Sequence, residues 1–188
     1  SDMDVAYLRC FELGTPEIQV IKEVRIPPSQ DWLDANDANS APLGTLGSDA
    51  EYRITVSNLS TEFTVENLTI DDAQLNLNVS GLTLAKAGDV GASRSFTGAD
   101  NQFEALHVEN ACQSAGAFTN TVDVQGTPVP VDPNDVYNGG DVADEDPAVR
   151  LCEEPAIEII KEVRRLGDTD PNAWIDANTA GSALSLPL

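Results

Sequence analysis

Clustered acidic side chains make up most of the charged groups in this chain of 188 residues, which has 32 Asp and Glu against 10 Lys and Arg. Ca²⁺ prefers six to eight oxygen ligands, and Asp and Asn side chains on loops can supply them. The sequence therefore predicts calcium binding at two predicted loops. The candidate ligands are Asp31, Asp34 and Asp37 in the first loop and Asp141, Asp144 and Asp146 in the second, a long loop that also holds Asp132 and Asp135.

The same acidic residues have a second explanation, which the sequence leaves open. An EF-hand that began at Asp34 would have Ala38 at its fifth position and Thr45 at its twelfth, and neither is the ligand that the motif needs there. Asp and Asn also favour turns without any metal, because their side chains hydrogen-bond to nearby backbone groups. The alternative to a calcium site is a solvated acidic surface with Asx turns.

The chain lacks the residue combinations that the common kinds of catalytic site need. The single histidine, His107, lies in an alternating segment typical of a strand, where we expect a structural role. The sequence has no cluster of Cys and His suited to zinc and no glycine-rich phosphate loop. Paired carboxylates could hydrolyse sugars, but aromatic residues make up only 5% of the chain, too few to line a sugar cleft. We therefore expect no enzymatic activity.

The net charge of −22 restricts the partners of the chain. Nucleic acids and anionic membranes attract clustered positive charge, so neither is expected to bind. No apolar run approaches the ~20 residues that a membrane-spanning helix needs. A hydrophobic fraction of 41% is too high for a disordered acidic tail, so the chain should fold around a core.

An internal repeat determines how these residues are placed. The segment IQVIKEVR at 18–25 recurs as IEIIKEVR at 157–164, and WLDANDANSA at 32–41 recurs as WIDANTAGSA at 174–183. Likewise, DMDVAYLRC at 2–10 parallels DEDPAVRLC at 144–152, and its cysteines are offset by 142 residues. The repeat divides the chain into the end of a preceding repeat, one complete repeat and the start of a following repeat, at residues 1–10, 11–152 and 153–188.

The three cysteines follow the same division. Cys112 and Cys152 lie within one repeat, 40 residues apart, so we predict that they form a disulfide. Cys10 is the repeat equivalent of Cys152, and its partner would precede Ser1. A disulfide favours an oxidising, extracellular setting, whereas the alternative is three free thiols in a cytosolic protein.

Strand patterns dominate the complete repeat. Residues 50–58, for example, alternate apolar and polar side chains, and Gly, Asn, Asp, Ser and Pro separate the segments. Helix is expected at most as a turn around 31–37. The pattern predicts an all-β fold, an antiparallel immunoglobulin-like Greek-key β-sandwich repeated about every 142 residues. The predicted strands are 17–25, 50–58, 63–71, 73–79, 82–86, 103–109, 117–125 and 148–152.

Four segments in order carry a resemblance to a known family. They are IKEV at 21–24, WLDANDANSAP at 32–42, AEYRITVSNLS with ENLTIDD at 50–72, and GAFTNTVDVQG with VADEDPA at 116–148. Together they resemble the Ig-like "conserved repeat" domains of large bacterial and archaeal surface proteins. The resemblance implies an extracellular, non-enzymatic module that forms stalks or adheres, and it does not supply a ligand.

The predicted function follows from the repeat and the resemblance. We expect a structural module of a surface fibre, stalk or filament that assembles head-to-tail with copies of itself or with adjacent repeats. The apolar strand at 157–164 should pack with a neighbouring unit, either a covalent neighbour or another subunit that exchanges strands. The alternative is an adhesin module that binds a protein or glycan through its loops, and an accessory domain of a secreted enzyme is a third possibility.

Two further features have a structural and a functional interpretation. Trp32 and its repeat equivalent Trp174 could stack on sugars, but we expect them to be packing anchors. Asn58, Asn67 and Asn78 each begin a glycosylation sequon, which also arises by chance among Asn, Ser and Thr on strands.

Overall fold

The computed structural model describes residues 13–155, 162–164, 167, 169–170 and 175–176. It divides into two compact units, Ser1–Glu154 and Pro155–Leu188. The described part of the first unit contains strands β1 to β9 and one short 3₁₀ helix, and β10 and β11 lie in the second unit.

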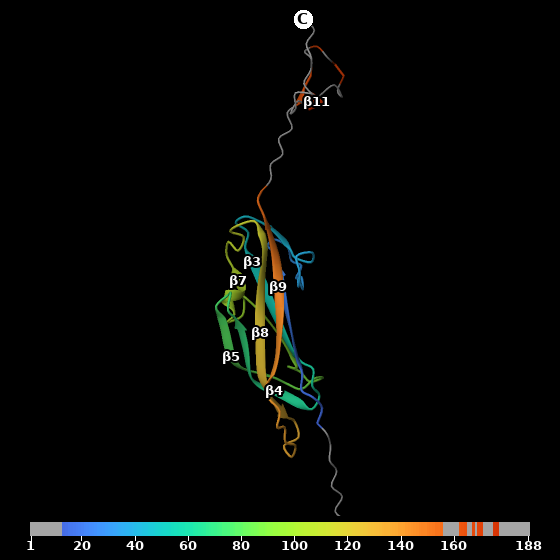
Figure 1. Cartoon of the computed structure of the whole chain (residues 1–188), viewed down its shortest axis with the longest axis vertical. Helices are drawn as coiled ribbons and strands as arrows, with labels where there is room; N and C mark the ends of the chain where they lie inside the picture. Colours follow the sequence, from blue (N-terminus) through green and yellow to red (C-terminus); the bar gives the residue numbers. More distant parts are fainter. Residues whose placement is uncertain (1–12, 156–161, 165–166, 168, 171–174, 177–188) are drawn as a thin grey trace, which may run out of the picture. The chain divides into compact units, whose positions relative to one another are not determined.

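The first unit consists of two β-sheets (Figure 1). The smaller sheet has the order β1-β3-β6, with β7 also paired to β3, and the larger has the order β2-β9-β8-β4-β5. The smaller sheet is made of β1 (Ile18–Arg25), β3 (Ala50–Asn58), β6 (Ser93–Thr97) and β7 (His107–Val108). The larger is made of β2 (Leu43–Thr45), β4 (Phe63–Asp72), β5 (Leu77–Leu84), β8 (Gly116–Pro130) and β9 (Val142–Glu153).

Alternating side chains build one core between the sheets. Every second residue of β3 is buried, and β1 alternates in the same way through Ile18, Val20, Lys22 and Val24. One hydrophobic cluster includes residues from both sheets, such as Ile54 of β3 and Val122 of β8. The prediction of an all-β fold is confirmed, and two sheets around one core are consistent with a β-sandwich.

The larger sheet is mixed, which corrects the prediction of purely antiparallel pairing. The short strand β2 runs parallel to the end of β9, and Gly44 lies opposite Cys152. The sequence of β2, Leu-Gly-Thr, is too short to show a strand period, so neither the strand nor its direction was predicted. The strand β6 was also missed, because its Ser-Arg-Ser-Phe-Thr sequence exposes most of its side chains.

Other boundaries differ from the sequence prediction. The predicted strands 73–79 and 82–86 form the single strand β5, after a turn at 73–76. The predicted strand at 103–109 is mostly the 3₁₀ helix η1 (Glu104–Leu106), followed by β7. No helix forms at 31–37, where the chain has an isolated bridge at Leu33 and bends at 36–37 before a turn at 38–40.

β8 and β9 are much longer than predicted and lie side by side through eleven residue pairs (Figure 1). The prediction ended β8 at Gln125, because Gly-Thr-Pro follows. The strand continues since Gly126 packs closely on β4, where an added Cβ would lie 2.4 Å from Cγ1 of Val65. β9 begins at Val142, so Asp144 and Asp146 lie on a strand and not in the predicted loop.

The second unit repeats a local pairing of the first. β10 (Glu162–Val163) pairs with β11 (Ile175–Asp176), with Val163 opposite Ile175. In the first unit, Val24 and Leu33 form an isolated antiparallel bridge. Val24 and Val163 hold the same place in the two sequence copies, as do Leu33 and Ile175. The sequence repeat is therefore also a repeat of local structure.

Candidate functional site

A disulfide joins Cys112 to Cys152 at the end of β9, and their Cα atoms are 5.5 Å apart. Both cysteines are buried. A covalent link across 40 residues constrains the unfolded chain and is worth roughly 4 kcal/mol in the chain-entropy model. The pair is the one predicted from the repeat, and Cys10 lies outside the described residues.

The first predicted calcium loop contains a hydrogen-bonded turn. Oδ1 of Asp37 accepts hydrogen bonds from the backbone N–H groups of Asn39 at 2.7 Å and Ser40 at 3.1 Å. This is the Asx turn that the alternative explanation predicts. Asp31 and Asp34 are exposed in the same segment.

The second group of predicted ligands makes contacts to neighbouring strands. Asp141 accepts hydrogen bonds from Nε2 of Gln125 at 3.1 Å and from Oγ1 of Thr127 at 2.9 Å. Asp144 and Asp146 reach across to β1. Oδ2 of Asp144 accepts the backbone N–H of Val20 at 2.7 Å, and Oδ2 of Asp146 accepts that of Lys22 at 2.5 Å.

The structure therefore does not gather all six carboxylates into one site, although Asp34 of the first group lies near enough to Asp144 and Asp146 of the second for their charges to interact. Within the described ranges, no group of three or more His, Cys, Asp or Glu residues is arranged to hold a metal ion. Burial raises the pKa of Asp146, and the nearby charges of Asp34 and Asp144 add to the effect, although the hydrogen bond from Lys22 opposes it. Calcium binding remains a prediction.

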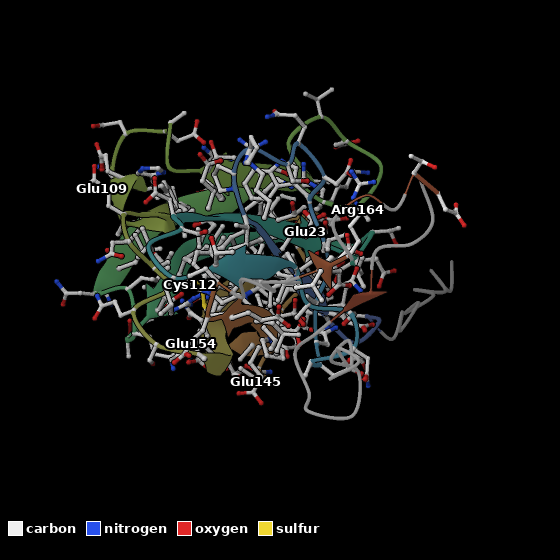
Figure 2. The ribbon with its side chains drawn as sticks, turned by 90° about the horizontal axis from the view of Figure 1, so that it is seen from above. Glu23, Glu109, Cys112, Glu145, Glu154 and Arg164 are labelled. Carbon is white, nitrogen blue, oxygen red and sulfur yellow. A yellow bond between two sulfur atoms is a disulfide. The ribbon has the colours of Figure 1, made fainter. Side chains whose placement is uncertain are left out.

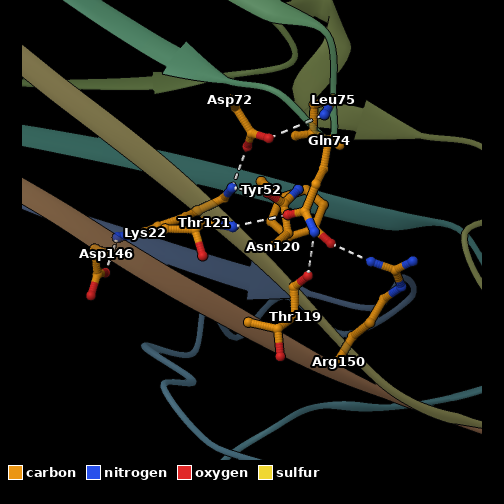
Figure 3. A network of polar contacts seen from close by, with 10 residues as sticks. All are labelled: Lys22, Tyr52, Asp72, Gln74, Leu75, Thr119, Asn120, Thr121, Asp146 and Arg150. Carbon is orange, nitrogen blue, oxygen red and sulfur yellow. Dashed lines mark hydrogen bonds and ion pairs between the residues drawn. The ribbon is translucent and has the colours of Figure 1, made fainter.

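A buried polar cluster that sequence reasoning missed lies between the two sheets. Lys22, Asp72 and Asn120 project into the interior from β1, β4 and β8, and each is at most 3% exposed. Nζ of Lys22 donates to Oδ2 of Asp72 in an ion pair and to Oδ1 of Asn120 at 2.6 Å. One ammonium group thus contacts two strands of the opposite sheet (Figure 3).

Tyr52 and Arg150 form a second layer around this cluster. Nζ of Lys22 lies 5.1 Å from the centre of the Tyr52 ring. The Tyr52 hydroxyl accepts a hydrogen bond from Nη1 of Arg150 at 2.6 Å, and the side chain of Asn120 is a neighbour of the same hydroxyl. Backbone N–H of Leu75 donates to Oδ1 of Asp72 at 3.1 Å. Both oxygens of Asp72 and the amide of Asn120 are therefore held in fixed orientations.

The electrostatics of the cluster follow from its burial. Desolvation lowers the pKa of Lys22, and its hydrogen bond to Asp72 and the charges of Asp72, Asp146 and Asp123 oppose this shift. Desolvation raises the pKa of Tyr52, which keeps the phenol protonated. Burying a charged pair is costly even when its geometry is good, so hydrophobic residues would often be at least as stable at such positions.

The signal for Lys22 was present in the sequence. The alternation of Ile18, Val20 and Val24 places position 22 on the buried face, where lysine is almost never found without a partner. The same lysine recurs in the second copy as Lys161. Its partners could not be identified because they lie 50 and 98 residues away along the chain.

Trp32 is half-buried and packs on two arginines. The guanidinium carbon of Arg25 lies 4.4 Å from the ring centre of Trp32, and that of Arg53 lies 5.0 Å away. The two arginines form ion pairs with Glu51 and Glu23. Trp32 thus packs on charged side chains at the surface, and Trp174 lies outside the described residues.

The remaining candidates are separated across the first unit. His107 is exposed, and its Nδ1 lies 3.5 Å from Oε1 of Glu51. Among the sequons, Asn58 is buried, and its Nδ2 donates to the carbonyl oxygens of Phe63 and Ala85. Asn67 and Asn78 are exposed.

Much of the negative charge lies on the surface. Figure 2 shows Glu109, Glu145 and Glu154 at the periphery of the ribbon, and all three are exposed. In the part of the chain that the structure describes, no helix is long and apolar enough to cross a bilayer. Comparison with known proteins found no matching family model, no matching curated protein and no matching solved structure.

Proposed function

We propose that this chain is a structural module of an extracellular surface fibre or stalk, built on an immunoglobulin-like Greek-key sandwich that repeats in tandem. The observation that carries the proposal is the recurrence of one unit in sequence and local structure, with Val24 opposite Leu33 and Val163 opposite Ile175. A repeated unit suits a spacer because each copy adds length without requiring a ligand.

Two properties support an extracellular setting. The Cys112–Cys152 disulfide suits an oxidising compartment, where such bonds form and persist. The net charge of −22 keeps neighbouring copies soluble by mutual repulsion.

We further propose that neighbouring repeats follow one another along a single chain. The complete repeat already contains its own first strand, since β1 pairs with β3 over eight residue pairs. It therefore does not need a strand donated by another subunit. Under this proposal, residues 157–164 begin the next sandwich as β1 begins this one.

Antibodies against residues 13–155 test the location on cells that make the protein. Intact cells should be labelled along surface filaments, and labelling only after permeabilisation would overturn the proposal. Denaturing electrophoresis after boiling with reductant tests the covalent array. The antibody should detect a chain much heavier than 20.0 kDa, whereas a band at that mass would favour separate subunits.

An adhesin module is the second candidate, and the surface around Trp32 is the observation that favours it. A pocket lined by Arg25, Trp32, Glu51 and His107 places aromatic and polar groups together at the surface. Fluorescence titration with a panel of soluble oligosaccharides would test this function. Saturable quenching that Trp32→Ala abolishes would support adhesion, and no quenching by any sugar would count against a glycan site here.

A further inference from the structure

We propose that Lys22 and Asn120 join through an intramolecular isopeptide bond, with Asp72 carrying the proton between them. The bond would link Nζ of Lys22 to Cγ of Asn120. It would connect β1 of one sheet to β8 of the other. This inference does not depend on the fibre function, because it concerns chemistry inside one sandwich.

The reacting groups are already in contact. Nζ of Lys22 lies 2.6 Å from Oδ1 of Asn120, the oxygen bonded to the carbon that would be attacked. Asp72 contacts the same Nζ from β4. All three side chains are enclosed in the core, at most 3% exposed. Fixing reactants in this way supplies much of the entropy that an intermolecular reaction would lose.

The surroundings favour the nucleophilic form of lysine. Only a neutral amine has a lone pair to attack an amide, and burial stabilises neutral forms over charged ones. Asp72 is the natural proton acceptor, since transfer from Nζ to its carboxylate converts a buried ion pair into two neutral groups. Desolvation of Lys22 lowers its pKa and so promotes this transfer.

The reaction balances without an oxidant or cofactor. The Nζ lone pair attacks Cγ of Asn120, and the carbonyl electrons move to Oδ1 to give a tetrahedral intermediate. When this intermediate collapses, the bond from Cγ to Nδ2 breaks. Asp72 delivers the proton that it took from the ammonium to Nδ2, which leaves as ammonia. Asp72 then takes the second proton that Nζ loses and passes it to the ammonia, which departs as ammonium. One carbon–nitrogen bond forms, one breaks, and Asp72 returns to its carboxylate state.

The neighbouring residues have defined roles in this scheme. The Tyr52 hydroxyl lies beside the Asn120 side chain and helps to orient the amide. The hydrogen bond from Arg150 holds that hydroxyl in place. The enclosed site also excludes water, which would otherwise compete as a nucleophile. Tyr52 and Arg150 are positioning residues, whereas Lys22, Asp72 and Asn120 are the reacting groups.

Mass spectrometry of the purified chain tests the proposal directly. After full reduction, the intact mass should be lower than the sequence mass by one ammonia. Trypsin should then yield residues 10–25, uncleaved at Lys22, joined to residues 95–150. A succinimide at Asn138–Gly139 would lose the same mass, so the joined peptides are the deciding observation. Separate peptides with cleavage after Lys22 would overturn the proposal.

Three variants assign the roles, with circular dichroism used to verify folding. Lys22→Met and Asp72→Asn should retain the full sequence mass, whereas the surface control Lys86→Met should still lose ammonia. Asn120→Asp should lose water or nothing, because its side chain has no ammonia to release. Loss of ammonia from folded Lys22→Met or Asn120→Asp, without a succinimide at Asn138–Gly139, would overturn the assignment. If the core variants fail to fold, the joined peptides of the unmodified chain decide the question alone.

Discussion

Asp146 shows how a single carboxylate connects strands and responds to pH. Its side chain accepts the backbone N–H of Lys22, and its pKa is raised mainly by burial. A raised pKa in the folded state means that protonated Asp146 favours folding. This stabilising contribution is complete below the pKa of the unfolded chain and is lost as pH rises through the folded pKa.

We therefore predict that Asp146→Asn becomes more stable relative to the original chain as pH increases. The Asn side chain keeps an oxygen for the N–H of Lys22 but cannot ionise. Urea unfolding between pH 3 and pH 7 measures the difference between the two chains, so that the titration of other carboxylates cancels. A difference that shrinks or reverses with rising pH would contradict the raised pKa.

Removing the Cys112–Cys152 disulfide should be costly. Replacing both cysteines by alanine should lower the free energy of unfolding by roughly 4 kcal/mol, the value expected for a closed loop of 40 residues. Urea denaturation of the two chains provides the measurement. Alkylation in denaturant without reductant checks the premise, since Cys112 and Cys152 should stay unlabelled, and labelling of both would show that the bond is absent.

Single residues were predictable where their role depends on the repeat, and not where it depends on distant strands. Cys112 and Cys152 were paired correctly from their places in the repeat. Asp144 and Asp146 were assigned to a calcium loop because Asp-Glu-Asp-Pro has the composition of a turn. Their actual hydrogen-bond donors, on β1, lie 124 residues away and leave no local sequence signal.

At the scale of elements, the meeting of β8 and β4 depends on a glycine. β4 departs from regular pairing with β8 between Glu66 and Thr69, and Asn67 has a positive φ of 50° there. Gly126 fits against this irregularity without a side chain. Glycine inside a strand often marks such a close approach of another chain segment.

We predict that Gly126→Ala destabilises the fold by about 1 to 3 kcal/mol, the usual range for overpacking a core. The new methyl group would lie 2.4 Å from Cγ1 of Val65 and 3.1 Å from Cδ1 of Leu68, so these buried side chains or the strands that carry them must shift. Gly140→Ala is the matched control, because an added Cβ there meets nothing within 4 Å. Equal melting temperatures for the two variants would show that β4 and β8 adjust freely.

Element type was easier to predict than element length. The period of two in 50–58 gave β3 with its correct bounds, because one face of that strand is buried throughout. β8 and β9 were cut short, since Gly, Pro and Asp normally end strands. Their pairing with each other over eleven residues outweighs those local preferences. No local pattern can reveal this pairing.

For the whole molecule, calcium is the remaining prediction from the acidic composition. A ligand that binds only the folded state stabilises it by roughly 2.7 kcal/mol at a hundredfold excess over its dissociation constant. EDTA should accordingly lower the melting temperature by several degrees at fixed ionic strength. An unchanged melting curve would leave the solvated acidic surface as the explanation. Asp37 would then only stabilise its Asx turn, and Asp144 and Asp146 would only accept backbone N–H groups of β1.

The hydrogen bonds that Asp144 and Asp146 accept from β1 also protect the protein from its own copies. β1 is the outermost strand of its sheet, and such strands offer unpaired N–H groups on which a foreign strand can grow into an aggregate. Here the two carboxylates accept hydrogen bonds from the backbone N–H groups of Val20 and Lys22. The carbonyl oxygen of Leu33 accepts one from the backbone N–H of Val24 at 2.9 Å. In the tandem array proposed above, near-identical strands would be tethered at high local concentration, where mispairing between neighbours is a characteristic failure. By accepting these N–H groups, the two aspartates therefore hinder the pairing of a foreign strand with β1.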